Sequence, residues 1–407
     1  MFARVLRNIC RNEGASRVLR KGFATEGKGE VTALYEFHVE NGGRMVNFGG
    51  FMLPVQYADL GIAASHLHTR KSASMFDVSH MLQTEIVGAD CLPYMESICT
   101  ADLQNLPPNS SILTVFTTPE GGVLDDLIIT KISDDHLYVV SNAAMKKQDQ
   151  AHLLQALDNH KKANPATEIK IKFFDPQERG LVALQGPKAA QVLQKLTDID
   201  LSTLYFMTSS EATVCSAGAC RITRCGYTGE DGFEISMPAI KAVDISREIL
   251  RNEDVKLAGL GARDSLRLEA GLCLYGSDLT ADTTPVEAAL TWLISKRRRE
   301  ARDFPGADVI LGQIKEGSVK KRIGLVADLG PPARHGTVVV DGDGNDVGSV
   351  TSGCPAPSLG KNIAMAYVPT ELSKAGTQLR LRVRDKLYGA VVTKMPFVPS
   401  NYYTRPK

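Results

Sequence analysis

Alternating apolar and polar residues predict a series of strands in the first two-thirds of the chain. Apolar runs at residues 127–130 and 136–140 flank the polar turn Ser133-Asp134-Asp135, which is typical of a hairpin. Residues 181–184 form a continuous apolar run that predicts a buried strand. Residues 233–236 alternate in polarity and predict a strand that is buried on one face.

Helical spacing appears between these strands. It predicts a helix from Ala144 to Leu157, a second from Pro187 to about Leu196, and a third that begins near Ala262. Strands and helices therefore alternate, yet no glycine-rich dinucleotide fingerprint follows any strand. The pattern predicts an α+β body.

The pattern changes after Trp292, where a basic run and a stretch containing proline and glycine precede a new set of short strands. Turn signals such as residues 341–345 separate these strands at the intervals typical of a barrel. We expect an α+β region over residues 33–320 and a C-terminal β-barrel over residues 321–407. The predicted barrel strands are residues 322–327, 337–340, 346–351, 363–367, 378–383 and 390–393.

Composition limits the class of protein. A chain of 407 residues predicts two or three domains, and 43% hydrophobic with 23% charged residues is typical of a soluble globular protein. The net charge of +1 argues against bulk nucleic-acid binding. No apolar run approaches the roughly 18 residues of a membrane span. We therefore expect neither nucleic-acid nor membrane partners.

The N-terminus departs from this average. Residues 1–25 carry six arginines and lysines against the single acidic residue Glu13, with apolar residues at loosely helical spacing. Such a basic, amphipathic, acid-poor segment is typical of a mitochondrial transit peptide, which we predict over residues 1–28. The alternative is a basic tail on a cytosolic protein.

Neither cysteines nor histidines form a metal pattern. The eight cysteines contain no C-x-x-C pair and are expected to be small buried residues in a reducing compartment. His38, His66, His68 and His80 invite a metal site, but no third ligand accompanies the His66-x-His68 pair. The sequence predicts no metal.

The segment from Arg224 to Glu234, called here the signature loop, holds three glycines among acidic and aromatic residues. Glycine allows sharp turns and close approach of the backbone to a ligand. A carboxylate at such a turn can accept hydrogen bonds from a flat, nitrogen-rich ligand, whereas it would repel a phosphate. The alternative is a plain hairpin with a solvated acidic tip.

Asp125 and Asp126 follow Gly121-Gly122 and open a predicted strand. Neighbouring strand residues point to opposite faces, so only one aspartate can face a pocket. The other is expected to cap the turn or to be solvated. Alternatively, the pair is only part of a turn.

Several long runs, in order from about Ala33 to the C-terminus, resemble the folate-dependent aminomethyltransferases, the T-proteins of the glycine cleavage system. Several ordered runs are far more specific than any single motif. The matching runs are residues 34–38, 76–81, 121–127, 183–187, 224–234, 261–271 and 351–355.

The resemblance implies a reaction and its partners. It implies a folate-binding catalytic body of interwoven subdomains in the mitochondrial matrix. The aminomethyl group on the dihydrolipoyl arm of H-protein would be the donor and tetrahydrofolate the acceptor. The products would be 5,10-methylenetetrahydrofolate, ammonia and the reduced carrier, as part of glycine catabolism.

The resemblance also implies the site residues. Asp126 matches the catalytic aspartate, which would lie near the folate N10. Glu234 matches a glutamate that accepts hydrogen bonds from the pterin. Arg263 and Tyr402 match further folate contacts, and Trp292 and Arg322 fall at pocket positions.

Two of these residues also have a simpler interpretation. Arg263 could pair with Asp264 or Glu269, and Tyr402 could lie in a frayed tail. The basic run Lys296–Arg299 is either a solvated face or a docking patch for an acidic partner protein.

Two other functions are compatible with this fold. Folate-dependent demethylating enzymes of the sarcosine or dimethylglycine dehydrogenase type carry a flavin domain with a Rossmann fingerprint, which this chain lacks. Folate-binding assembly factors for iron–sulfur proteins carry a Lys-Gly-Cys-Tyr-x-Gly-Gln-Glu motif. Residues 225–230 differ from that motif.

Overall fold

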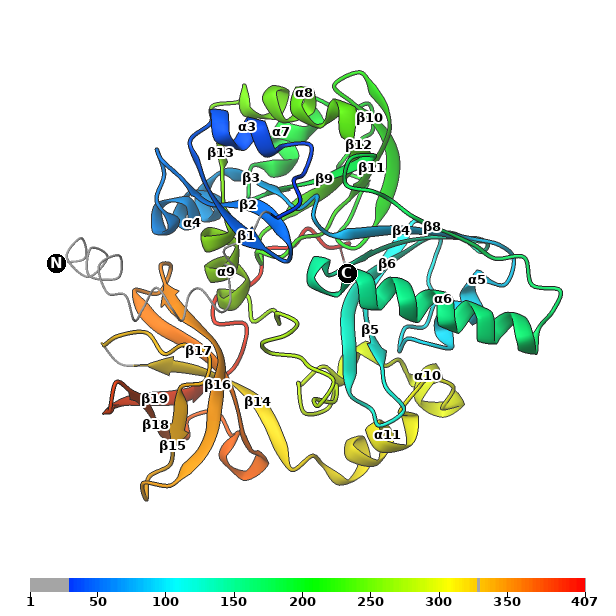
Figure 1. The fold of residues 1–407 in the computed structure, drawn as a ribbon. Coiled ribbons are helices and arrows are strands. Elements are labelled where there is room, and N and C mark those ends of the chain that lie inside the picture. Colours follow the sequence, from blue (N-terminus) through cyan, green and yellow to red (C-terminus); the bar gives the residue numbers. More distant parts are fainter. Residues whose placement is uncertain (1–28, 328–329, 407) are drawn as a thin grey trace.

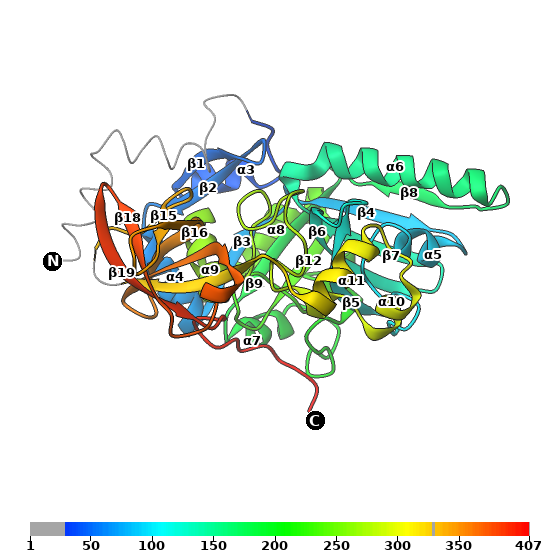
Figure 2. The ribbon, with the colours of Figure 1, turned by 90° about the horizontal axis from the view of Figure 1, so that it is seen from below.

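The computed structural model describes residues 29–327 and 330–406, arranged as three lobes around a common centre (Figure 1). The predicted transit segment 1–28 lies outside the described residues. Two lobes are built on open sheets and the third is a closed barrel. Seen from below, the barrel and the five-stranded lobe lie at opposite ends of the molecule (Figure 2).

The first lobe is built on a six-stranded sheet in the order β10-β11-β12-β9-β3-β13. Its strands are β10 (Ser209–Val214), β11 (Ala217–Thr223), β12 (Gly232–Pro238), β9 (Arg179–Gln185), β3 (Ala73–Asp77) and β13 (Val255–Leu257). Only β13 and β3 are parallel. The lobe also holds the hairpin β1 (Gly43–Phe48) and β2 (Phe51–Tyr57), with α3 (Tyr35–Glu40), α4 (Ile62–Lys71), α7 (Ala189–Gln194), α8 (Ala239–Leu250) and α9 (Leu260–Glu269).

The second lobe is built on a five-stranded antiparallel sheet in the order β5-β6-β7-β4-β8. Its strands are β4 (Leu82–Val87), β5 (Ser110–Thr117), β6 (Val123–Ser133), β7 (His136–Ser141) and β8 (Lys170–Phe173). The surrounding helices are α5 (Cys91–Glu96), η1 (Ala143–Met145), α6 (Lys146–Ala163), η2 (Thr291–Leu293), α10 (Lys296–Ala301) and α11 (Ala307–Glu316).

The chain passes between these two lobes more than once. It enters the first sheet at β3, builds the whole second sheet, and returns to the first sheet at β9. After α9 it goes back to the second lobe to form α10 and α11 (Figure 1). The predicted interwoven subdomains are therefore present, and the α+β class is confirmed.

The third lobe is a closed barrel in the strand order β14-β17-β16-β15-β18-β19. Its strands are β14 (Lys320–Ala327), β15 (Val338–Val340), β16 (Asp346–Ala356), β17 (Lys361–Pro369), β18 (Gln378–Val383) and β19 (Lys386–Thr393), with η3 (Thr370–Leu372) between β17 and β18. All six predicted strands occur, and closure leaves no exposed sheet edge. The barrel packs on the first lobe through Leu268 of α9, which joins Ile363 and Met365 in one buried cluster.

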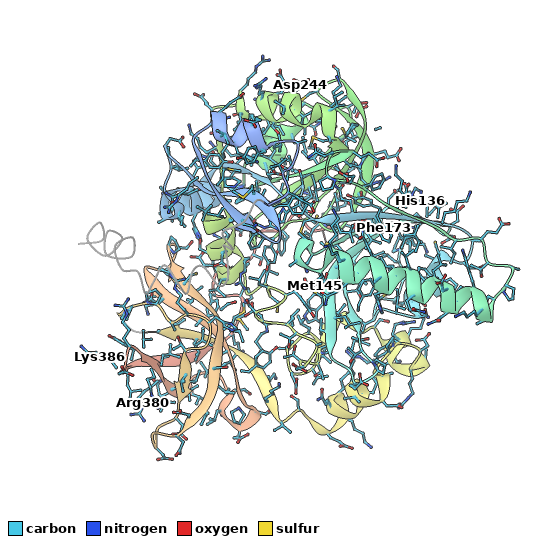
Figure 3. The ribbon with its side chains drawn as sticks, in the orientation of Figure 1. His136, Met145, Phe173, Asp244, Arg380 and Lys386 are labelled. Atoms are coloured by element: carbon cyan, nitrogen blue, oxygen red, sulfur yellow. The ribbon has the colours of Figure 1, made fainter. Side chains whose placement is uncertain are left out.

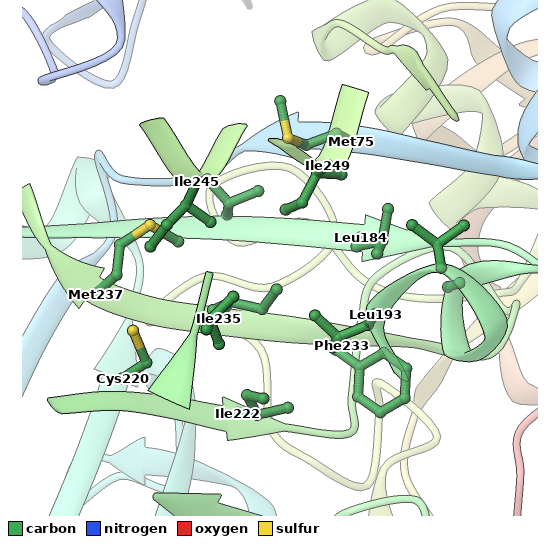
Figure 4. Packing of buried hydrophobic residues seen from close by; sticks show 14 of the residues in the cluster. Met75, Leu184, Leu193, Cys220, Ile222, Phe233, Ile235, Met237, Ile245 and Ile249 are labelled. Carbon is green, nitrogen blue, oxygen red and sulfur yellow. The ribbon is translucent and has the colours of Figure 1, made fainter. Parts of the chain in front are cut away.

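Each lobe has its own core. In the first, Ile235 and Met237 of β12 and Leu184 of β9 pack under Ile245 and Ile249 of α8 (Figure 4). Exposed charged residues such as Asp244 of α8 and Lys386 of β19 lie at the rims of two lobes (Figure 3). Within the described ranges, no helix has both the length and the apolar character needed to cross a membrane.

Most predicted elements of the α+β region are found, with two differences. The hairpin of β6 and β7 is confirmed. The helix predicted to end before Asn159 continues to Ala163, because its polar last turn needs no buried partner. Helix α7 begins at Ala189, two residues beyond Pro187.

Candidate active site

A cavity of about 920 Å³ lies where the three lobes meet, and residues of both sheets and of the barrel line it. All six residues singled out from the sequence line this cavity. They are Asp126 of β6, Glu234 of β12, Arg263 of α9, Trp292 of η2, Arg322 of β14 and Tyr402 near the C-terminus. The fold thus gathers residues that are up to 276 positions apart.

Asp126 is placed by a tight turn and one asparagine. Gly121 has a φ of +84°, and a Cβ at Gly122 would lie 1.7 Å from the carbonyl oxygen of Ala281, so no other residue fits there. The side-chain Nδ2 of Asn142 donates a hydrogen bond to Asp126 Oδ1 at 3.0 Å. Asp126 is consequently fixed near the start of β6, close to the turn that joins β5 to β6, and it lines the cavity.

Two further carboxyl groups lie behind Asp126. Asp125 is fully buried and accepts hydrogen bonds from the backbone amide of Asn142 at 3.1 Å and from its Nδ2 at 2.9 Å. Asp149, at the start of α6, accepts one from Ser141 Oγ at 2.6 Å. We call Asp125, Asp126 and Asp149 the aspartate cluster. The expectation that Asp125 caps the turn or is solvated is wrong, because its carboxylate is buried against Asn142 and against Asp149 of α6.

Burial and mutual repulsion raise the pKa values of these acids. Burial, followed by the charge of Asp125, raises the pKa of Asp126 to about 7. Burial and the neighbouring Asp149 raise the pKa of Asp125 as well. Among the described residues, no lysine or arginine offsets these charges. Asp126 is therefore suited to take up or give up a proton near neutral pH.

Glu234 and Arg263 also line the cavity. The Arg263 guanidinium lies 4.8 Å from the ring centroid of Tyr227, and its buried Nη1 has no hydrogen-bond partner in the part of the chain that the structure describes. Burial raises the pKa of Glu234, although the charge of Arg263 works against that rise. A carboxylate and a guanidinium that share a cavity with unused hydrogen-bonding capacity are suited to a polar, planar ligand.

The alternative ion pair of Arg263 is not formed. Arg267, one helical turn later, pairs instead with Asp264 at 2.9 Å and with Asp278 at 2.7 Å. This leaves Arg263 directed toward the cavity.

The signature loop is held from within rather than solvated. Arg224 donates to both carboxylate oxygens of Asp231 at 2.9 and 2.6 Å. Gly226 lies against the side chain of Gln185, where a Cβ would come within 1.8 Å of Oε1. Glu230 is 2% exposed. The alternative of a hairpin with a solvated acidic tip is therefore wrong for this loop.

The last residues of the chain return to the cavity. Tyr402 stacks on Phe206 with ring centroids 4.0 Å apart and an interplanar angle of 13°. The neighbouring Asn401 forms a parallel bridge with Glu230 of the signature loop. Tyr402 is therefore held in place and is not part of a frayed tail.

Trp292 and Arg322 differ in their availability. Trp292 lines the cavity but is 65% exposed, so it lies at the rim. Arg322 is 6% exposed, and its Nε donates to the Ala288 carbonyl at 2.9 Å. Its Nη1 lies 3.1 Å from the Met365 sulfur. Much of the bonding capacity of Arg322 is thus used in joining the barrel to the body.

Sequence reasoning missed three contributors to the site. Asn142 carried no pattern that separates it from other polar residues, and Tyr227 was noted only as an aromatic residue of the signature loop. His80 was considered only as a metal ligand, yet it lines the cavity and its Nδ1 has no partner among the described residues. Burial lowers the pKa of His80 to about 4, so its imidazole is neutral. Its place in the run of residues 76–81 was the available signal.

The three other histidines that were considered as metal ligands, His38, His66 and His68, have structural partners. His38 Nε2 lies 2.9 Å from Asp77, and His66 Nε2 lies 3.0 Å from Glu269. Within residues 29–327 and 330–406, no three or more histidine, cysteine, aspartate or glutamate side chains are arranged so that they could hold a metal ion.

The basic run Lys296–Arg299 is mostly turned inward, so its prediction as a solvated face or docking patch is wrong. Arg298 is fully buried and pairs with Glu96 and Asp303 at 3.2 and 2.9 Å. Arg297 also pairs with Glu96. The two arginines turn inward because they meet Glu96 at the end of α5, Asp102 beyond it, and Asp303.

Comparison with known proteins decides the family. A family model described as the GCVT N-terminal domain matches residues 34–298, and one described as the glycine cleavage T-protein C-terminal barrel domain matches residues 320–399. The chain belongs to the glycine cleavage T-protein family. The family resemblance inferred from the sequence is confirmed.

Similar proteins extend over nearly the whole chain. The mitochondrial aminomethyltransferase of Homo sapiens is 52% identical over 373 residues, covering 92% of this chain and 91% of the relative. That of Gallus gallus is 49% identical over 98% of this chain and 99% of the relative. The crystal structure of aminomethyltransferase T from Bartonella henselae superposes with a TM-score of 0.86 at 37% identity, covering 93% of this chain and 100% of that one.

These matches confirm that the chain is an enzyme of the aminomethyltransferase class. They give no support to the iron–sulfur assembly alternative. The eukaryotic relatives are named as mitochondrial, in agreement with the predicted compartment.

Proposed function

We propose that this chain transfers the methylene carbon of an aminomethyl group to tetrahydrofolate. The donor would be carried on the dihydrolipoyl arm of H-protein, and the products would be 5,10-methylenetetrahydrofolate, ammonia and the reduced carrier. The observation that carries the proposal is the cavity, whose lining holds a carboxyl group of near-neutral pKa together with Glu234 and with Arg263, whose Nη1 has no hydrogen-bond partner among the described residues.

The residues of the cavity fit tetrahydrofolate. The partnerless Nη1 of Arg263 and the Glu234 carboxylate offer one donor and one acceptor group to a pterin, which carries both kinds of partner on its edge. Tyr402 and Phe206 supply aromatic faces for stacking. Tetrahydrofolate would supply the nucleophilic nitrogens that accept the one-carbon unit.

Each site residue has a proposed role. Asp126 would move a proton at its carboxylate or stabilise developing positive charge on the folate side of the reaction. Glu234 would accept hydrogen bonds from the pterin, and Arg263 would position it. Tyr402 would close one wall of the pocket, Trp292 would lie at its rim, and Arg322 would anchor the barrel beside it.

The chemistry needs no covalent bond to the enzyme. The cavity would mainly bring the amine-bearing carbon and the accepting nitrogen together, and such positioning can lower a barrier by several kcal/mol. We place the reaction in the mitochondrial matrix. Residues 33–320 would form the folate-binding catalytic region and residues 321–407 the barrel.

One assay tests the proposal. Ammonia release from aminomethyl-loaded H-protein should be fast with tetrahydrofolate and slow without it. The one-carbon unit should be recovered on the folate. Equal rates with and without tetrahydrofolate, or no reaction with the loaded carrier, would rule out this function.

A further inference from the structure

The C-terminal residues 397–403, called here the C-terminal strap, run from the barrel across the first lobe. The backbone amides of Phe397 and Val398 donate to the carbonyl of Glu269 at 2.9 and 3.0 Å. The amide of Asn401 donates to the carbonyl of Gly229 at 2.8 Å. The strap is thus attached to α9 at one end and to the signature loop at the other, and Tyr402 follows the second attachment.

Arg70, in the last turn of α4, lies beneath this second attachment. Its Nη1 donates to the Thr228 carbonyl at 2.7 Å and to Glu230 Oε1 at 2.9 Å. Its Nη2 donates to Glu269 Oε2 at 3.0 Å, and its Nε lies 3.3 Å from the same oxygen. The guanidinium therefore joins the signature loop to α9 with a bidentate geometry that a lysine cannot reproduce.

Glu230 connects Arg70 to the C-terminal strap. One of its carboxylate oxygens accepts from Arg70, and the other accepts from Asn401 Nδ2 at 3.0 Å. The side chains of Glu230 and Glu269 are 2% and 0% exposed, and that of Arg70 is 10% exposed. Removing the arginine would leave two buried carboxylates without their cation, which is costly enough to make Glu230 move or take up a proton.

We propose that Arg70 is a positioning residue of the active site, which acts through Glu230 and Asn401 to hold the C-terminal strap and hence Tyr402 against the cavity. Arg70 does not line the cavity itself. The inference rests on the proposed folate-binding role of Tyr402.

Hydrogen exchange tests the structural part without substrate. In Arg70→Gln, peptides containing residues 397–403 should exchange faster than in the wild type, whereas peptides from β16 and β17 of the barrel should not change. Arg247→Gln is the matched control, because it breaks an exposed ion pair with Glu40. Asn401→Ala removes the outer end of the link but leaves the ion pair between Arg70 and Glu230 in place, so it serves if Arg70→Gln folds poorly. Unchanged strap exchange in the folded variants would overturn the proposal.

Tetrahydrofolate titration tests the functional part. We expect Arg70→Gln and Tyr402→Ala each to raise the dissociation constant about tenfold, and the double variant to be no weaker than Tyr402→Ala alone. Arg70→Lys should recover part of the loss. In turnover, the Michaelis constant for folate should rise far more than kcat falls.

Two contrary results are distinguishable. If Arg70→Gln causes the same fold loss on the Tyr402→Ala background as on the wild type, the arginine acts by another route and the inference is wrong. If the wild type does not bind tetrahydrofolate, or Tyr402→Ala leaves its affinity unchanged, the proposed function or the assigned role of Tyr402 fails instead. The exchange measurement then still decides whether Arg70 holds the strap.

Discussion

Two clusters of charged residues in the second lobe are built in opposite ways. Around Arg298, the buried charges are of both signs, and Glu96 and Asp303 compensate the guanidinium. In the aspartate cluster, three acids share the donors of Asn142 and Ser141, and none of them forms an ion pair with a described lysine or arginine.

The difference shows that one charged cluster of this lobe stabilises the fold, whereas the other is suited to catalysis. A compensated cluster keeps its charges at every physiological pH, so it can fasten α10 to α5 but offers nothing to a substrate. An uncompensated cluster holds pKa values near the working pH, which favours proton transfer and the binding of developing positive charge.

Replacing Asp126 should have the largest effect on activity. Asp126→Asn keeps the shape of the side chain but can neither accept a proton nor carry charge, so we expect turnover to fall by about 10²–10⁴. Tetrahydrofolate affinity should stay within a few-fold. Single-turnover ammonia release and calorimetric titration measure the two quantities.

Asp125→Asn is the matched control and should cost much less turnover, because Asp125 faces Asn142 and Asp149 rather than the cavity. Equal losses at the two positions would show that the assignment of faces is wrong.

Breaking the compensated cluster should affect stability instead. Arg298→Leu removes one of the two arginines that pair with the buried Glu96 and leaves the backbone carbonyls of Glu96 and Cys99 without their donor. We expect a loss of about 3–5 kcal/mol in the free energy of unfolding. Denaturant unfolding measures it. Lys296→Gln is the control, since Lys296 is 90% exposed and should change little. A stable Arg298→Leu protein with impaired turnover would contradict the separation of roles.

Glu234→Gln should weaken folate binding. An amide presents a donor where the carboxylate accepted hydrogen bonds, at a cost of about 1–3 kcal/mol in a buried site. The corresponding rise in the dissociation constant is measurable by calorimetry. Unaltered binding would remove Glu234 from the folate contacts.

The smallest predicted effect is a shift in pH dependence. Because the pKa of Asp126 is raised to about 7, the ionised form grows as pH rises through that value, and turnover should rise with it. The charge of Asp125 contributes to that raised pKa. Asp125→Asn should therefore move the acidic limb of the kcat profile to lower pH, by less than about one unit. A shift to higher pH would show that the repulsion does not act as described.

Local pattern was sufficient for much of the architecture. The barrel strands and the β6–β7 hairpin follow from alternation and turn residues, because both depend on neighbours in the chain. The helix α6 was predicted too short, since its exposed last turn carries no apolar signal.

The burial and the partners of charged side chains were harder to predict from the sequence than the positions of strands and helices. The run Lys296–Arg299 has the composition of a surface segment, but Arg298 of α10 pairs with Glu96 of α5, which comes 202 positions earlier in the chain. Asp125 is equally unremarkable in sequence, and only the cover of α6 makes it a buried acid. Sequence alone does not state which partner a charged side chain will meet.

The sequence by itself therefore determined the family, the α+β body, the barrel and the six residues that line the cavity. Only the folded structure shows which buried charges are compensated. It also shows that Arg263 and His80 each have a buried nitrogen without a hydrogen-bond partner among the described residues, and that Arg70 is linked to the C-terminal strap through Glu230. The physical reason is that polarity patterns arise from contacts close in the chain, whereas the pKa and the partner of a buried group depend on every element packed around it.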